Sequence, residues 1–151
     1  MTKEREAGED GPHIHYLEMG PWPVYVGFTE SEEAFDKEML RLGITNKVPF
    51  VGNGGNAAAT AHLFENTSGS TCAIITIAGL RGRPRPAVAS LIAHEAVHVV
   101  QYIREEINRN EPLGDEAEAY IVQYIVEEIL VSLWRPSKVR ASTVPPTYKG
   151  R

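Results

Sequence analysis

The stretch LIAHEAVHVVQY, residues 91–102, places two histidines and a glutamate inside a run of apolar side chains. Apolar positions continue on both sides at helical spacing, which predicts a helix from about residue 87 to residue 107. The apolar residues surround nearly the whole helix, and this pattern favours burial. Because a buried carboxylate or imidazole is costly without a partner, the three polar side chains need one.

His94 and His98 are four residues apart, so their side chains point to the same side of a helix. Neutral imidazole nitrogen is a good zinc ligand, and a rigid helix presents two such groups with little loss of entropy. Glu95 lies about 100° round the helix axis, where it can take a proton from a water at the ion. We therefore expect one Zn²⁺ per chain, with His94 and His98 as ligands and Glu95 as general base.

A catalytic zinc ion has three protein ligands and one open position. A second helix is expected at residues 115–134, and its first turn offers Glu116 and Glu118 as competing third ligands. Asp115 and Glu118 have the spacing of a capping box, which would give both of them a structural role. Glu116 is therefore the expected third ligand, and Glu118 remains the alternative.

The 151 residues suffice for one hydrophobic core, and the order of the expected elements indicates an α+β fold, a small sheet packed on a helical layer. These elements are a strand at 21–29, a helix at 29–43 capped by Thr29 or Ser31, strands at 57–66 and 70–80 joined by a turn, and the two long helices.

We expect one domain at residues 13–134, between a disordered segment at 1–12 and a basic, Pro-containing tail at 135–151. The body of the chain is acidic and the net charge is -5, which argues against nucleic acid as a partner. We find neither a secretory signal nor an apolar run of about 18 residues, so a cytoplasmic protein without membrane contact is expected. The single cysteine, Cys72, excludes an internal disulfide and is expected to be a small buried hydrophobe.

HEAVH followed by a helical EAEAY resembles the zincin metallopeptidases, in particular the gluzincins, and among them the very small gluzincin-like proteins of phages and prophages. The resemblance covers residues 57–130 and implies a mixed or antiparallel sheet beside an active-site helix, with an edge strand lining the cleft. It implies zinc binding by His94, His98 and Glu116, and Glu95 as the base that also returns a proton to the leaving amine. The host would be a bacterium or a phage-infected cell.

Two further residues are candidates for the site. Tyr120 lies one turn after Glu116 and would stabilise the oxyanion or orient the ligand; the alternative is a packing role. His62 alternates with its neighbours in the strand at 57–66 and would contact substrate if that strand borders the cleft. The alternative is an ordinary strand histidine. The segment STCAIITIAG, residues 70–79, is the expected substrate-binding edge.

The function expected from these features is that of a small zinc-dependent metallopeptidase, an endopeptidase acting on peptide or protein substrates. One alternative is a zincin-fold, zinc-binding interaction or assembly protein without peptidase activity. A weaker alternative is a zinc hydrolase that acts on a non-peptide amide.

Overall fold

The computed structural model describes residues 11–65, 69–107, 114–134 and 145. Apart from residues 11, 12 and 145, the segments expected to be a disordered N-terminus and a basic tail lie outside this range. The described chain is α+β, as predicted. Its elements are β1 His15–Tyr16, β2 Val24–Thr29, α1 Glu32–Arg41, β3 Ala59–Glu65, β4 Thr71–Ile77, α2 Arg85–Ile107 and α3 Asp115–Trp134, with short 3-10 turns at Asn53–Gly55 and Leu80–Gly82.

The four strands form one mixed sheet in the order β1-β2-β4-β3. β3 and β4 pair antiparallel as the predicted hairpin, and β1 also pairs antiparallel with β2. The central pair, β2 and β4, is parallel, with Val24 opposite Thr71 and Thr29 opposite Thr76. The two residues of β1 were not predicted as a strand.

The expectation that residues 70–79 form the exposed edge is wrong. β4 has a paired neighbour on each side, and each of its seven residues is buried. A strand covered on both faces has no need of alternating polar residues, and TCAIITI is an almost continuous apolar run of this kind. The edge strand next to α2 is β3. Its residues are buried at Ala59 and His62 and partly or fully exposed at the other positions.

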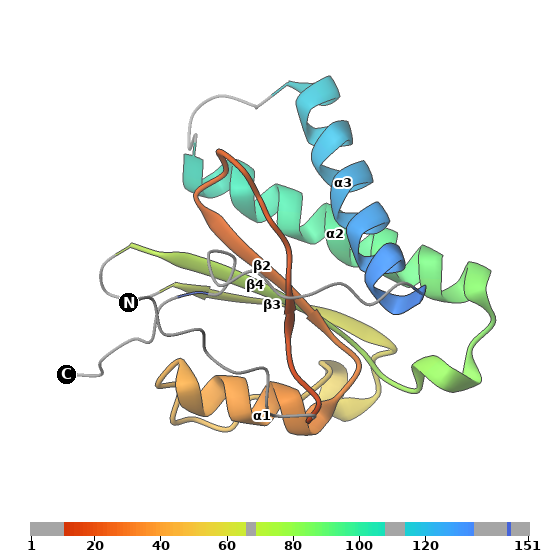
Figure 1. Ribbon diagram of the computed structural model, residues 1–151. Coiled ribbons are helices and arrows are strands. Elements are labelled where there is room, and N and C mark those ends of the chain that lie inside the picture. The colour runs from red at the N-terminus through yellow and green to blue at the C-terminus, as the bar shows by residue number, and fades with distance from the viewer. Residues whose placement is uncertain (1–10, 66–68, 108–113, 135–144, 146–151) are drawn as a thin grey trace, which may run out of the picture.

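Helices cover both faces of the sheet, whereas the sequence predicted a single helical layer. α1 lies on one face, and α2 and α3 lie on the other (Figure 1). On the α1 side, Phe35 and Met39 pack with Cys72 and Ile74 of β4. On the other side, the alternate residues of β2 and β4 pack with the apolar stripes of α2 and α3. The sheet therefore separates two hydrophobic cores, one on each of its faces.

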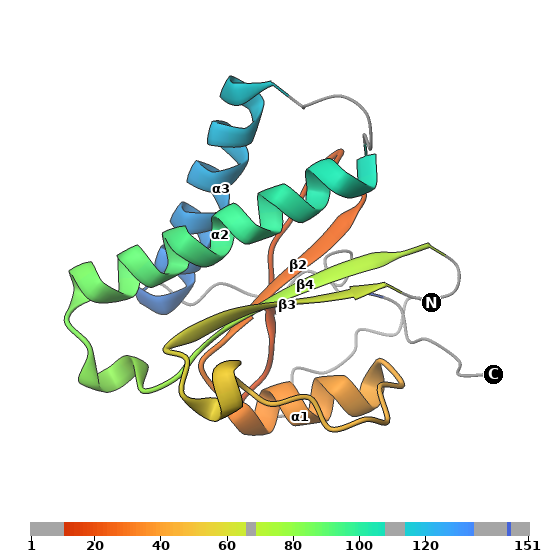
Figure 2. The same ribbon diagram turned by 180° about the vertical axis from the view of Figure 1, so that it is seen from behind.

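The two long helices divide their face of the sheet between them. α2 lies over β4 and β3, and α3 lies on the β1 and β2 side, as Figures 1 and 2 show from opposite directions. α3 buries Ile121, Ile125 and Ile129, which are four residues apart and form one stripe. No described helix is both long enough and apolar enough to cross a membrane.

α1 begins and ends where its sequence predicts. The Ser31 hydroxyl oxygen accepts a hydrogen bond from the Ala34 N–H at 3.2 Å, which makes Ser31 the N-cap. After the helix, Gly43 has φ +77°, a left-handed conformation that glycine adopts without steric cost.

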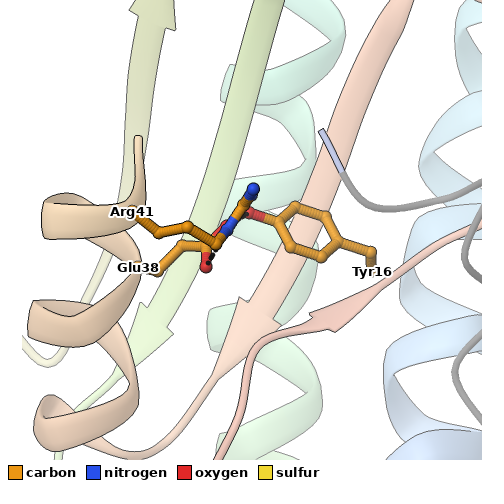
Figure 3. Close-up of polar contacts among 3 residues, drawn as sticks. All are labelled: Tyr16, Glu38 and Arg41. Carbon is orange, nitrogen blue, oxygen red and sulfur yellow. Dashed lines mark hydrogen bonds and ion pairs between the residues drawn. The ribbon is translucent and has the colours of Figure 1, made fainter. Parts of the chain in front are cut away.

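A buried polar cluster ties β1 to α1 (Figure 3). The Tyr16 hydroxyl donates to Glu38 Oε1 at 2.6 Å, and Arg41 donates from Nε to Glu38 Oε2 at 2.9 Å. Burial raises the pKa of Tyr16 far above its usual 10, so the hydroxyl keeps its proton. Burial also raises the pKa of the neighbouring Cys72 thiol, to about 12, and the thiol is fully buried as expected.

Candidate metal centre

The two histidines of the HEAVH motif face each other on α2. Their Nε2 atoms are 3.2 Å apart, and both side chains are exposed. Two nitrogen ligands of a tetrahedral zinc ion, each about 2.0–2.1 Å from it, lie about 3.3 Å from one another. The separation therefore fits a pair that grips one ion. It also suits an N–H···N hydrogen bond between the rings, so the distance alone fits both arrangements.

The Gln101 side chain is a hydrogen-bond partner of His98. The Nδ1 atom of His98 lies 3.2 Å from the Gln101 side-chain oxygen, which can only accept a hydrogen bond. If Nδ1 carries the proton and donates it, Nε2 has its lone pair free and directed toward His94. An oxygen acceptor behind a histidine ligand fixes tautomer and ring orientation in metal sites generally.

The expectation that apolar side chains bury the whole of α2 is wrong. Ile92, Ala96 and Val99 are buried, but His94, Val97 and His98 lie on an exposed side of the helix. α3 packs beside α2 (Figure 2), and the buried residues of α2 belong to the core that α2 and α3 form with the sheet. The two imidazoles therefore meet water and need no metal to offset burial.

Glu95 is the one polar member of the motif that is buried, with 7% of its surface exposed. Its Oε2 atom accepts a hydrogen bond from the backbone N–H of Ala61 in β3 at 2.8 Å. A single side chain thus joins the middle of α2 to the edge strand. The bond stabilises the buried carboxylate and fixes it against the edge strand.

A groove of about 440 Å³ lies between α2 and the edge strand β3. Ala61 and Leu63 line it from β3, and Glu95, His98 and Gln101 line it from α2. The groove therefore brings one ligand candidate and the candidate base together beside the outer edge of β3.

The residues proposed from α3 do not join the pair. Glu116 and Tyr120 are exposed, and 62% of the tyrosine surface is open to solvent. Among residues 11–65, 69–107, 114–134 and 145, no three His, Cys, Asp or Glu side chains form a group that could hold a metal ion. The start of α3 lies near the C-terminal part of α2, where Arg104 pairs with Glu118 at 3.4 Å.

The capping box expected at Asp115 and Glu118 does not form. Asp115 is already the first helical residue, so Gly114 precedes the helix and its carbonyl accepts from the Glu118 N–H at 3.1 Å. The Glu118 side chain is engaged with Arg104 instead. Glu118 therefore has a structural role, as expected, but its partner is Arg104 and not the start of its own helix.

His62 lies on the opposite face of the sheet from α2. Its Nε2–H donates to the Phe50 carbonyl at 2.9 Å, and its ring lies 4.6 Å from that of Phe35 in α1. Burial lowers the pKa of His62, so the ring is neutral at pH 7. His62 does not line the groove beside Glu95, and its hydrogen bond and ring contacts are those of a core histidine.

Two groups at the site were not identified from the sequence, the Ala61 backbone N–H and the Gln101 side chain. Gln101 is three residues after His98, a helical spacing that could have identified it as a partner. The Ala61 contact carries no sequence signal, because any residue supplies the same N–H. Comparison with known proteins adds no relative, since no family model, no curated protein and no solved structure matches the chain.

Proposed function

We propose that this protein is a small zinc-dependent metallopeptidase whose metal is held by His94 and His98. The observation that carries the proposal is the 3.2 Å separation of the two Nε2 atoms on an open helix side, with Glu95 fixed in the groove that His98 also lines. This combination supplies two metal ligands on one helix side, together with a groove that holds His98 and the Glu95 carboxylate and is open to a substrate.

The residues of the groove have distinct tasks in this proposal. A bound zinc ion would polarise the scissile carbonyl and make a water more acidic. Glu95 would accept the proton of the attacking water and pass it to the leaving amine. Its Oε2 atom is held by Ala61, so Oε1 is the oxygen left for proton transfer. Gln101 would keep the His98 ring in the tautomer that binds metal.

The substrate in this proposal is an extended peptide that runs along β3. The inner side of β3 is paired to β4, and its outer side borders the groove. Strand addition at such an edge supplies backbone hydrogen bonds without regard to sequence. Ala61 and Leu63 line this edge, and Leu63 is 41% exposed, so it offers an apolar contact to a substrate side chain.

The third ligand in this proposal is Glu116, which is exposed and belongs to the first turn of α3. The engagement of Glu118 with Arg104 favours Glu116 over Glu118. Zinc binding through Glu116 would require the start of α3 to approach His94 and His98. The alternative is a zinc ion held by the two histidines, with water molecules as the remaining ligands.

The test compares Glu95→Gln with the wild-type protein, both loaded with zinc. Glutamine keeps an oxygen acceptor for Ala61 but cannot take a proton, so cleavage of a fluorescently labelled casein should fall by at least about 100-fold. Zinc affinity should remain within about threefold of the wild type, since Glu95 is not a ligand. Glu32→Gln, an exposed acid on α1, is the matched control and should cleave normally.

Three outcomes separate the alternatives. Equal cleavage by Glu95→Gln and the wild type would refute a peptidase that uses Glu95. Zinc binding without cleavage by the wild-type protein would favour the interaction or assembly protein. Zinc-dependent hydrolysis of an amide such as N-acetylated amino acids, without casein cleavage, would favour the non-peptide hydrolase.

A further inference from the structure

A second pocket lies where the two parallel strands end. β2 and β4 are neighbours and run in the same direction, so their carboxyl ends meet at one edge of the sheet. From Thr29 the chain turns to α1 on one face, and from Ile77 it passes through Leu80–Gly82 to α2 on the other face (Figure 1). In sheets with parallel strands, the crevice between two such diverging connections is the usual ligand site.

The structure has a cavity of about 670 Å³ at this position. Its walls come from the end of β2 through Phe28, from the turn after β4 through Arg81, from β1 through His15, and from the end of α3 through Leu133 and Trp134. The volume is within the range of small-molecule sites, which is about 300–1,000 Å³. None of the described residues that line this cavity also lines the groove beside Glu95.

Arg81 offers a position for an anionic group on the wall of the pocket, whereas Glu30 on the same lining carries the opposite charge. Arg81 is exposed at the rim, and its guanidinium is always charged and forms paired hydrogen bonds to carboxylate or phosphate. His13 and His15 add ring nitrogens. Burial lowers the pKa of His15 although Glu128 opposes the shift, so this ring is neutral at pH 7 and Arg81 supplies the lasting charge.

The apolar groups of the pocket favour a flat ring. Phe28, Leu133 and Trp134 contribute aromatic and aliphatic surface to the same cavity. The guanidinium of Arg85 lies 5.0 Å from the centre of the Trp134 ring and adds positive charge nearby. Glu30, also on the lining, offers an acceptor for a ligand hydroxyl or N–H.

We propose that this pocket binds a small organic anion that carries an aromatic ring, with the anionic group at Arg81 and the ring against Trp134. A phosphate ester and a carboxylate share this chemistry. The site does not depend on the metal or on the groove of α2, so its test is independent of the test of the proposed peptidase.

The test is a titration of the full-length protein followed by ¹H–¹⁵N nuclear magnetic resonance. Phenyl phosphate, phenylacetate and benzyl alcohol serve as probes, and the Trp134 indole N–H is the principal reporter. Saturable shifts are expected for at least one anion with a Kd below about 1 mM, and benzyl alcohol should bind at least about tenfold more weakly. Tighter binding of phenyl phosphate or of phenylacetate would identify which anionic group is preferred.

Two variants locate the site. Arg81→Gln should weaken the better anion by at least about tenfold, whereas Lys47→Gln, the same charge change at an exposed position elsewhere, should stay within about twofold. Trp134→Leu should weaken the aromatic anion by about fivefold. No saturable shift up to 10-fold above the expected Kd, equal binding of benzyl alcohol, or an unchanged Arg81→Gln protein would each overturn the proposal.

Discussion

Glu95 of α2 and Ala61 of β3 are joined by a hydrogen bond of 2.8 Å, from the Ala61 backbone N–H to Glu95 Oε2. The bond connects residues 34 positions apart in the chain and fixes the carboxylate of the HEAVH motif to the edge of the sheet. It gives Glu95 a structural role beside any catalytic one, and the two roles can be separated by the choice of substitution.

Glu95→Ala should destabilise the protein, and Glu95→Gln should do so much less. Alanine removes the acceptor of the Ala61 N–H and leaves a space beside the edge strand, which should cost about 1–3 kcal/mol in the free energy of unfolding. Glutamine retains an acceptor oxygen. Urea denaturation of both variants measures the difference, and equal stability of the two would show that the hydrogen bond contributes nothing.

Tyr16→Phe should destabilise the protein through the loss of one buried hydrogen bond to Glu38. Hydrogen bonds to charged groups contribute about 1.5–3 kcal/mol, and this one is shielded from solvent. The matched control is Glu33→Gln, which breaks the exposed Glu33–Lys37 pair on the same helix and should cost no more than about 0.5 kcal/mol. Similar losses for the two variants, in urea or thermal denaturation, would contradict a structural role for the cluster.

The free energy of unfolding should fall as the pH drops below 6.5. Burial lowers the pKa of His62 in the folded state, so the unfolded chain takes up a proton first and gains stability in acid. The loss begins near the unfolded value of 6.5 and ends at the folded pKa. His15 contributes in the same direction because burial lowers its pKa too.

His62→Gln is the variant that tests this pH dependence. Glutamine can still donate to the Phe50 carbonyl but does not titrate, so the slope of stability between pH 7.5 and 5 should become shallower. A slope that is the same in His62→Gln as in the wild type would assign the acid sensitivity to other groups.

The local sequence was sufficient to predict most helices and strands. α3 coincides with its predicted range of residues 115–134, and α1 begins after one of the two caps that were expected, because apolar spacing and capping side chains act within a few residues. β1 was missed because two residues are too few for a periodic pattern, and its pairing depends on β2.

The arrangement of these elements was harder to predict. The central position of β4 was signalled by the unbroken apolar run TCAIITI, but the run was interpreted as an edge. The exposure of His94 and His98 depends on how α2 packs with α3 and the sheet, which is a tertiary property. The contact between Glu95 and Ala61 involves a backbone group, so no residue type could have indicated it.

The zinc affinity of the purified protein, without a histidine tag, tests the central claim most directly. Isothermal titration should give one zinc ion per chain, and His94→Ala and His98→Ala should each weaken binding by at least about 100-fold, whereas His13→Ala should not. Glu116→Ala should weaken binding more than Glu118→Ala does. Zinc binding below about 0.2 ions per chain, or equal affinity of the His94→Ala, His98→Ala and His13→Ala proteins, would contradict a metal centre on α2.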